Sequence, residues 1–283
     1  MTPVDTLPES TSVGRVALRV GDLDRLTEFY RDVVGLSVRE RCDEHATLGA
    51  DDRALLELFA APDRSEREPS ETGLFHTAFL LPSRADLGDA LSRIRERWHL
   101  DGASDHLVSE ALYLDDPEGN GIEIYRDRPH EEWPIEGDRV EMDTLPLDLD
   151  ALEDRRRGGA GVPTNTTVGH VHLEISSLAR AREFYVDGLG LGVRQEWSDA
   201  ALFVAAGDYH HHLGLNTWNG RTVPPRGRGL AWFELVVPDR AALSALRDRL
   251  EGRGIETRDH ENGIVLTDPD GIELRVRPDP IAE

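Results

Sequence analysis

Two stretches of the chain repeat one another, and this duplication constrains the fold more than any other feature. VGRVALRVGDLDRLTEFYRDVVGLSV, starting at Val13, and VGHVHLEISSLARAREFYVDGLGLGV, starting at Val168, are identical at 13 of 26 positions without a gap. Each copy predicts an alternating strand, then a helix that carries the Glu-Phe-Tyr triplet, then a glycine turn. A chain with such a duplication is expected to fold as repeated modules.

A second, weaker repeat extends the pattern over the rest of the chain. GLFHTAFLLPSRADLGDALSRI corresponds to GLAWFELVVPDRAALSALRDRL, and both are followed by a turn and a strand, DDPEGNGIEIY and TDPDGIELRV. The sequence therefore predicts an α+β fold of four β-α-β-β-β modules, near residues 11–60, 73–128, 166–218 and 229–277. We expect these modules to form two domains, and the predicted division is residues 11–130, a linker at 131–165, and residues 166–279. The linker, charged and rich in glycine and proline, is predicted to hold one short helix.

The charge of the chain argues against two classes of partner. The formal net charge is −23, and all 32 basic residues are arginine, since the sequence contains no lysine. Such a negative field repels nucleic acids and anionic membranes, so neither is an expected partner. An acidic surface without lysine resembles that of cytosolic proteins from salt-accumulating halophiles, where dense salt screens the repulsion.

Other features of the composition predict a cytoplasmic protein. The chain has no run of about 18 apolar residues, as a membrane helix would need, and its first residues lack the pattern of a secretory leader. Cys42 is the single cysteine, so no disulfide can form within the chain, which suits a reducing compartment. The sequence leaves open whether the protein forms a homo-oligomer.

The repeated motifs resemble those of the vicinal oxygen chelate superfamily, which includes glyoxalase I, fosfomycin-resistance proteins and type I extradiol dioxygenases. The similar parts are the openings that end in FYRDVVGL and FYVDGLGL and the endings DPEGNGIE and DPDGIE. The resemblance covers nearly the whole chain and implies paired modules that curve into an open β cup with a metal ion at its floor. Four modules are typical of the dioxygenase branch, and the GASDHLVSEA and YHHHLGLN stretches are most similar to the catechol 2,3-dioxygenase group.

The resemblance also implies where the metal ligands lie, namely on the first and last strands of modules. The corresponding first-strand residues, in chain order, are Arg15, His76, His170 and Trp232. The corresponding last-strand residues are Glu57, Glu123, Gly214 and Glu273. Arginine stays protonated and an indole offers no suitable lone pair, so only the two histidines can bind a metal.

His76, His170 and Glu123 are therefore the predicted metal ligands. Two imidazoles and one carboxylate form the triad that suits Fe(II), with Mn(II) as an alternative. Typical extradiol enzymes take this triad from modules three and four, whereas here it comes from modules two and three. Either the modules pair one-with-four and two-with-three, which we favour, or the site is built across subunits.

Four further residues are candidates for catalysis by resemblance. Tyr113 lies ten residues before Glu123, as a substrate-binding tyrosine does in extradiol enzymes, and His106 matches the histidine of an upstream DHxxS element. The acid–base histidine of module three corresponds to His211, but alternation along a strand would turn His212 inward instead. A neutral imidazole with a pKa of about 6.5 can accept and return a proton during ring cleavage.

The predicted function is extradiol cleavage of a catechol by dioxygen at a mononuclear two-histidine, one-glutamate metal centre. Its expected partners are a catecholic small molecule and dioxygen. A glyoxalase-type isomerase or thiol transferase is the alternative enzyme. Such sites usually use a fourth protein ligand where this chain has Gly214, which counts against this reading unless His212 substitutes. A non-enzymatic protein that binds or sequesters an aromatic compound is the third reading. His172, two residues beyond His170 on the same strand face, is a candidate for the wall of the cup.

Overall fold

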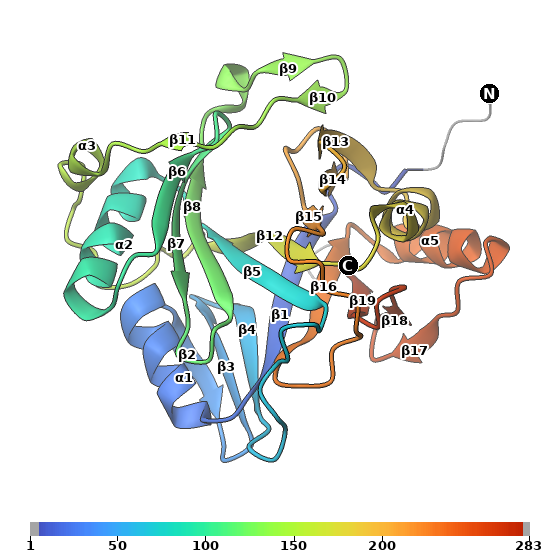
Figure 1. Cartoon of the computed structure of the whole chain (residues 1–283), viewed down its shortest axis with the longest axis horizontal. Coiled ribbons are helices and arrows are strands. Elements are labelled where there is room, and N and C mark those ends of the chain that lie inside the picture. Colours follow the sequence, from blue (N-terminus) through green and yellow to red (C-terminus); the bar gives the residue numbers. More distant parts are fainter. Residues whose placement is uncertain (1–5, 280–283) are drawn as a thin grey trace.

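The computed structural model describes residues 6–279, and it confirms an α+β fold of four β-α-β-β-β modules (Figure 1). Module one holds β1 (Ser12–Val20), α1 (Leu23–Phe29), β2 (Ser37–Arg41), β3 (His45–Ala50) and β4 (Arg53–Ala60). Module two holds β5 (Gly73–Leu80), α2 (Arg84–Arg97), β6 (Gly102–Asp105), β7 (Ser109–Asp115) and β8 (Gly121–Asp127). Module three holds β12 (Thr167–Glu174), α4 (Leu178–Ala181), β13 (Gly192–Trp197), β14 (Ala201–Ala205) and β15 (Leu213–Asn216). Module four holds β16 (Gly229–Val237), α5 (Arg240–Gly252), β17 (Arg258–His260), β18 (Gly263–Thr267) and β19 (Glu273–Pro278).

The two large sheets each combine one module from either half of the chain. Modules one and four share an eight-stranded sheet in which β1 pairs antiparallel with β16, and modules two and three share a nine-stranded sheet in which β5 pairs antiparallel with β12. Within every module the first strand runs parallel to the last, which places both strands at the centre of the sheet. Each cup is therefore built within one chain. One cup combines modules one and four, which are not neighbours in sequence, and the other combines modules two and three, which are joined by the longest connection.

A second set of contacts ties the modules together within each half of the chain. Helices α1 and α2 lie on one side of the molecule and α4 and α5 on the other (Figure 1). The tyrosine of each Glu-Phe-Tyr triplet donates a hydrogen bond to the first aspartate of the next module's DPxG turn: Tyr30 to Asp116 at 3.0 Å, and Tyr185 to Asp268 at 2.9 Å. The repeated Glu-Phe-Tyr and DPxG motifs therefore join module one to module two and module three to module four.

Residues 129–165 connect the two halves of the chain and also contact both ends of the nine-stranded sheet. They include a 3-10 turn (His130–Glu132), β9 (Ile135–Glu136), β10 (Arg139–Val140), β11 (Leu145–Pro146) and α3 (Leu149–Glu153). Strand β11 extends the nine-stranded sheet by pairing with β6, and the β9–β10 hairpin lies against β13 at the other end of the same sheet. The segment therefore crosses the open side of the cup formed by modules two and three.

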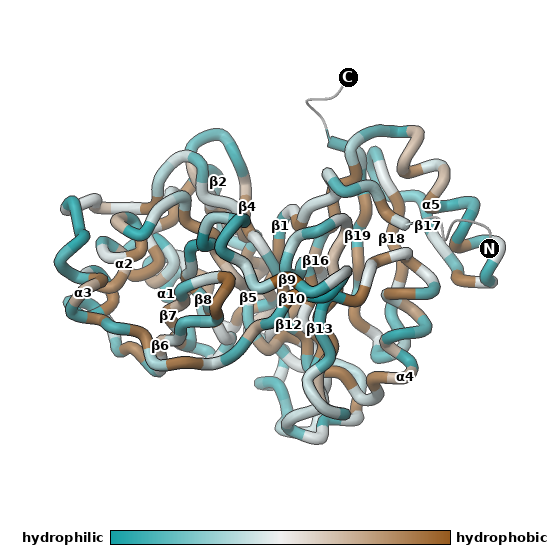
Figure 2. The backbone as a smooth tube through the Cα atoms, turned by 90° about the horizontal axis from the view of Figure 1, so that it is seen from above, coloured by the Kyte–Doolittle hydropathy of each residue, from teal (hydrophilic) through white to brown (hydrophobic). Residues whose placement is uncertain are grey.

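The hydrophobic core lies mainly between the sheets and their helices. Apolar residues follow the strands and helices, whereas the connecting loops are hydrophilic (Figure 2). The concave faces of the two sheets hold only small separate clusters, around Trp232 in one sheet and around Tyr125 in the other. Alternation along each strand thus leaves the concave faces free for polar side chains. No helix in the part of the chain described here is long and apolar enough to cross a membrane.

Burial raises the pKa of the Asp268 carboxyl to about 6 despite its hydrogen bonds from Tyr185 and backbone amides. Because the folded pKa lies above the value of about 4 in unfolded chains, this group favours folding below pH 4 and loses that contribution as the pH rises to 6. We expect Asp268→Asn to remove about 3 kcal/mol of this pH dependence. Urea unfolding of both proteins between pH 4 and pH 7 tests the prediction, and parallel stability curves would contradict it.

Candidate metal centre and its cavity

Three strands of the nine-stranded sheet bring His76, Glu123 and His170 together. In the register, Ala78 of β5 pairs with Glu123 of β8 on one side and with His170 of β12 on the other. His76 lies two residues before Ala78, so it points to the same concave face. The small Ala78 side chain leaves space into which all three longer side chains extend.

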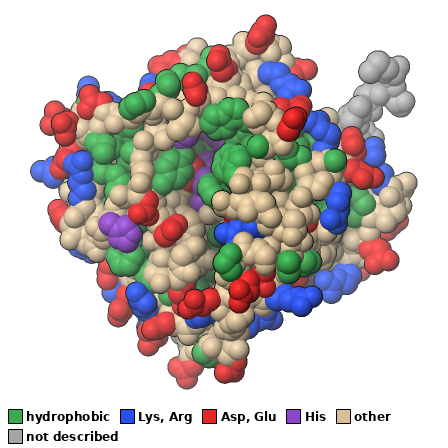
Figure 3. Space-filling model, in the orientation of Figure 1, with side chains coloured by type: hydrophobic (Ala, Val, Ile, Leu, Met, Phe, Trp, Pro, Cys, Tyr) green, Lys and Arg blue, Asp and Glu red, His purple; other side chains and the backbone are tan. Residues whose placement is uncertain are grey.

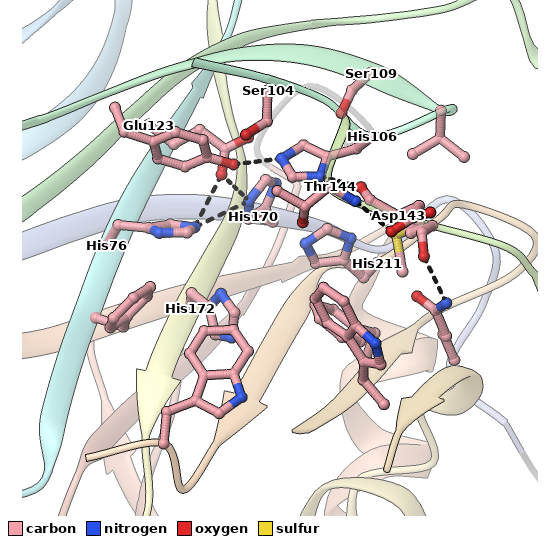
Figure 4. A pocket seen from close by; sticks show the side chains of 18 residues that line it. His76, Ser104, His106, Ser109, Glu123, Asp143, Thr144, His170, His172 and His211 are labelled. Carbon is pink, nitrogen blue, oxygen red and sulfur yellow. Dashed lines mark hydrogen bonds and ion pairs between the residues drawn. The ribbon is translucent and has the colours of Figure 1, made fainter. Parts of the chain in front are cut away.

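The ligand atoms of these residues converge at one buried point. The Nε2 atoms of His76 and His170 lie 2.9 and 3.0 Å from Oε2 of Glu123 and 3.4 Å from each other (Figure 4). Within residues 6–279, this is the one group of three such side chains with ligand atoms all within 4.8 Å of one another. All three predicted ligands are therefore placed where they could share a single ion.

Electrostatics keep these groups in the protonation states that a metal needs. Burial alone would raise the pKa of Glu123, but the adjacent His170 and His76 outweigh it and hold that pKa well below its usual range. Burial lowers the pKa of His170 to about 4. An ionised carboxylate beside a neutral imidazole is the donor set that divalent transition metals bind.

The equivalent place in the other sheet is occupied by the protein's own ion pairs. Arg15 contacts Glu57 at 2.5 Å and Glu234 at 3.0 Å, and Arg275 stacks on Trp232 with its guanidinium carbon 4.0 Å from the ring centroid. Here a guanidinium satisfies the carboxylate that would otherwise be a ligand. Modules one and four thus form a structural counterpart of the cup and lack a metal-binding group of this kind among the residues described.

A cavity of about 280 Å³ opens above the three predicted ligands. Figure 3 shows histidine side chains at the bottom of a hollow bordered by hydrophobic ones. Its wall includes the aromatic residues Phe75, Trp197, Phe203 and Trp218, of which the two tryptophans are partly exposed at the mouth. The volume and the apolar wall suit a small aromatic ligand.

Tyr113 and His106 form a hydrogen-bonded pair on the rim of this cavity. The hydroxyl of Tyr113 lies 2.6 Å from Nε2 of His106, whose Nδ1 lies 2.6 Å from the carbonyl oxygen of Asp143. A carbonyl only accepts, so Nδ1 carries the proton, and in a neutral ring Nε2 then accepts from the tyrosine. Burial, with nearby Glu123, raises the pKa of Tyr113 well above its usual value, so the phenol stays protonated.

The histidine triplet precedes β15, which begins at Leu213, so strand alternation does not govern it. His211 lines the cavity, and its ring centroid lies 4.1 Å from that of His170. His212 instead accepts a hydrogen bond from the backbone amide of Ala206 at 3.2 Å and is not among the residues that line the cavity. Burial lowers the pKa of both imidazoles, that of His212 to about 3. The geometry thus favours His211 as the histidine that faces a ligand.

Gly214 and His172 explain why the cup offers three candidate ligands and not four. The two residues pair across β12 and β15, and a Cβ atom on Gly214 would lie 2.7 Å from the ring of His172. The space of a fourth ligand is therefore filled by the His172 ring, which lies between Phe75 and Trp218. Its buried Nε2 has no hydrogen-bond partner among the residues described, and it faces the same cavity.

Sequence reasoning missed the contribution of the connecting segment. Met142, Asp143 and Thr144 form part of the cavity wall, although they lie in the stretch predicted to be a linker. No motif or period marked them, because their position depends on the pairing of β11 with β6. Asp127 was also missed, although its spacing of four residues from Glu123 places it on the same face of β8.

A curved sheet of paired β-α-β-β-β modules with a His–Glu–His group at its floor defines a class of metal-binding cup proteins, the vicinal oxygen chelate fold. The chain belongs to the Glyoxalase/Bleomycin resistance protein/Dioxygenase superfamily, whose family model matches residues 12–124 and 167–276.

Two curated relatives are similar in sequence. The chain is 41% identical over 276 residues to catechol-2,3-dioxygenase of Bacillus subtilis (strain 168), an alignment that covers 93% of this chain and 96% of the relative. It is 30% identical over 154 residues to biphenyl-2,3-diol 1,2-dioxygenase 3 of Rhodococcus globerulus, which covers 52% of this chain and 81% of that protein. Among solved structures, glyoxalase I from Zea mays has a TM-score of 0.58 at 18% identity, over 94% of this chain and 92% of that one. The last likeness shows a shared fold.

Proposed function

We propose that this protein is an extradiol dioxygenase that cleaves a catechol ring beside its two hydroxyl groups. The observation that carries the proposal is the convergence of His76, Glu123 and His170 at the floor of an aromatic-walled cavity. The 41% identity to a catechol-2,3-dioxygenase over almost the whole chain supports the same reaction. The donor set fits Fe(II), with Mn(II) as the alternative, because two imidazoles and one carboxylate leave coordination positions open.

His76, Glu123 and His170 would hold Fe(II), which when bound would supply the centre at which a catechol and dioxygen react. The chain's own residues orient the substrate and move its protons. The phenol of Tyr113 donates to His106, so its oxygen lone pairs are free to accept a hydrogen bond from a substrate hydroxyl. His211, neutral because of burial, is placed to accept the second hydroxyl proton and to return it later.

Anaerobic reconstitution with Fe(II), followed by catechol and then oxygen in high salt, tests the proposal. We expect oxygen uptake with the appearance of a yellow ring-cleavage product, and neither with metal-free protein. Folded protein that retains one equivalent of iron and consumes no oxygen with any catechol would refute the reaction. A glyoxalase-type reaction is disfavoured because Gly214 supplies no fourth ligand. A protein that only sequesters an aromatic compound would bind it without a bound metal.

The wall of the cavity also predicts which catechols are accepted. None of the residues that line it is lysine or arginine, and the net charge of the chain is −23. A carboxylate on the ring would therefore be desolvated without a cationic partner, at a cost of about 1–3 kcal/mol, or about 5- to 150-fold in kcat/KM. We expect 4-methylcatechol to exceed 3,4-dihydroxybenzoate by that factor in steady-state assays.

High salt serves as the control for this preference, because it screens long-range repulsion but leaves the desolvation cost unchanged. A preference for the carboxylated substrate in high salt would contradict the prediction.

A further inference from the structure

A line of hydrogen-bonded side chains runs from β8 to the cavity through the histidine triplet. Oδ1 of Asp127 lies 2.9 Å from Nε2 of His210, and Nδ1 of His210 lies 2.7 Å from Nδ1 of His211. The His210 side chain is fully buried, and the ring of His211 lines the cavity beside His170. The first and last members of this line are thus a carboxylate outside the cavity and an imidazole inside it.

With His210 as a neutral ring, the contacts define which nitrogen atoms carry protons. A carboxylate only accepts, so Nε2 of His210 donates to Asp127. In a neutral His210 ring the other nitrogen, Nδ1, then has a lone pair. Two ring nitrogens 2.7 Å apart share one proton, so Nδ1 of His211 must donate to it. The remaining nitrogen of His211, Nε2, is left as an acceptor.

Asp127 is itself held in place by a second hydrogen bond. Its second oxygen accepts a hydrogen bond from the hydroxyl of Tyr209 at 3.0 Å, and Tyr209 contacts the hydroxyl of Tyr125 at 2.8 Å. Asp127 also lies on the same strand and the same face as Glu123. Strand β8 therefore carries both the predicted metal ligand Glu123 and Asp127, the first member of the hydrogen-bonded line.

We propose that Asp127 and His210 are positioning residues that hold His211 in the tautomer with a free lone pair on Nε2. This proposal rests on the proposed function, in which His211 accepts a proton from the bound catechol. The two residues do not touch the substrate and act only through His211. Without them, either nitrogen of His211 could carry the proton, and the ring could turn away from its acceptor orientation.

Asp127→Asn is the sharpest test, because an amide can reverse the direction of donation in the hydrogen bonds from residue 127 to His211. The Asn side chain can still accept from Tyr209 while its NH₂ group donates to Nε2 of His210. His210 then carries its proton on Nδ1 and donates to His211, whose proton is forced onto Nε2. We expect nitrogen NMR of isotope-labelled histidine in the full chain to show the Nδ1–H tautomer of His211 in the wild type and the Nε2–H tautomer in the variant. Unchanged His211 signals would overturn the proposal.

Kinetics of the iron-loaded enzyme give an independent measurement. We expect Asp127→Asn to lower kcat by about 100-fold or more, the range of general acid–base catalysis, with KM changed by less than about threefold. Combining it with His211→Asn should cost little beyond the His211 change alone, because the two act as one unit. Independent, multiplicative losses would overturn the proposal.

Two further variants separate positioning from folding. Asp208→Asn makes the same chemical change at an exposed aspartate two residues before His210, which pairs with His130 at 3.3 Å, and it should leave kcat unchanged. Asp127→Glu keeps the carboxylate and should recover at least about tenfold of the activity lost in Asp127→Asn. Equal losses in both Asp127 variants would indicate a packing role and refute the proposal. Wild-type enzyme that cleaves no catechol would refute the proposed function alone, since the NMR result stands apart from turnover.

Discussion

Glu123→Gln is expected to abolish stoichiometric metal binding and, with it, catechol cleavage. Glu123 is the single carboxylate of the group, and its Oε2 lies within 3.0 Å of both imidazoles. Loss of a residue that only supports a ligand costs about 10- to 100-fold in metal affinity, so loss of the ligand itself should exceed about 100-fold. Metal analysis after dialysis, and calorimetric titration with Fe(II) under anaerobic conditions, measure the effect.

The other sheet supplies a matched control for this experiment. Glu57 pairs with Ala17 in the register that joins Glu123 to Ala78, but it contacts Arg15 and not two histidines. We expect Glu57→Gln to lower the free energy of unfolding and to leave the metal content unchanged. A Glu123→Gln protein that keeps one equivalent of iron with unaltered affinity would contradict the assignment, and so would loss of metal from Glu57→Gln.

His211→Asn is expected to lower kcat by about 10²- to 10⁴-fold while metal content and anaerobic catechol binding persist. His211 lines the cavity, and burial keeps its imidazole neutral, so its removal takes away the proton acceptor and leaves the three ligands in place. Stopped-flow measurement of oxygen consumption by the preformed enzyme–catechol complex isolates this step from binding.

The same change at His212 tests the competing assignment. His212 accepts a hydrogen bond from the Ala206 amide, so we expect His212→Asn to cost stability of about 1–3 kcal/mol and to change kcat little. The assignment to His211 is wrong if the His212 variant loses the activity and the His211 variant keeps it.

Comparison of the two sheets shows how one duplicated module serves two purposes. The position of His170 in module three is taken by Arg15 in module one, and that guanidinium bridges Glu57 and Glu234. An isolated carboxylate on the concave face would be costly to bury, so each cup neutralises its carboxylates, one with arginine and one with groups that can hold a metal. This difference supports a single metal centre per chain.

Much of the site could be predicted because the four modules of the chain can be aligned with one another. Strand and helix periods depend on neighbouring residues, so the four modules and their corresponding positions could be recognised without the structure. Comparing those positions singled out His76, Glu123 and His170, since arginine and tryptophan stand at the other two first-strand positions and leave Glu57 and Glu273 without a histidine partner. The roles of these residues remain predictions, but the structure places all three at one point.

Other features depend on contacts between residues far apart in the chain. The pairing of module one with four and of two with three, which the positions of the predicted ligands favoured, rests on the β1–β16 and β5–β12 ladders, which no local pattern encodes. The wall made by residues 142–144 arises only because β11 pairs with β6. Similarly, His211 rather than His212 faces the cavity because the triplet lies outside the strand, where Asp127 and the Ala206 backbone orient the rings. Local periodicity thus determined the modules, and the family resemblance indicated the predicted ligand positions within them, whereas long-range strand pairing and loop contacts decided the cup, its wall and the histidine that enters it.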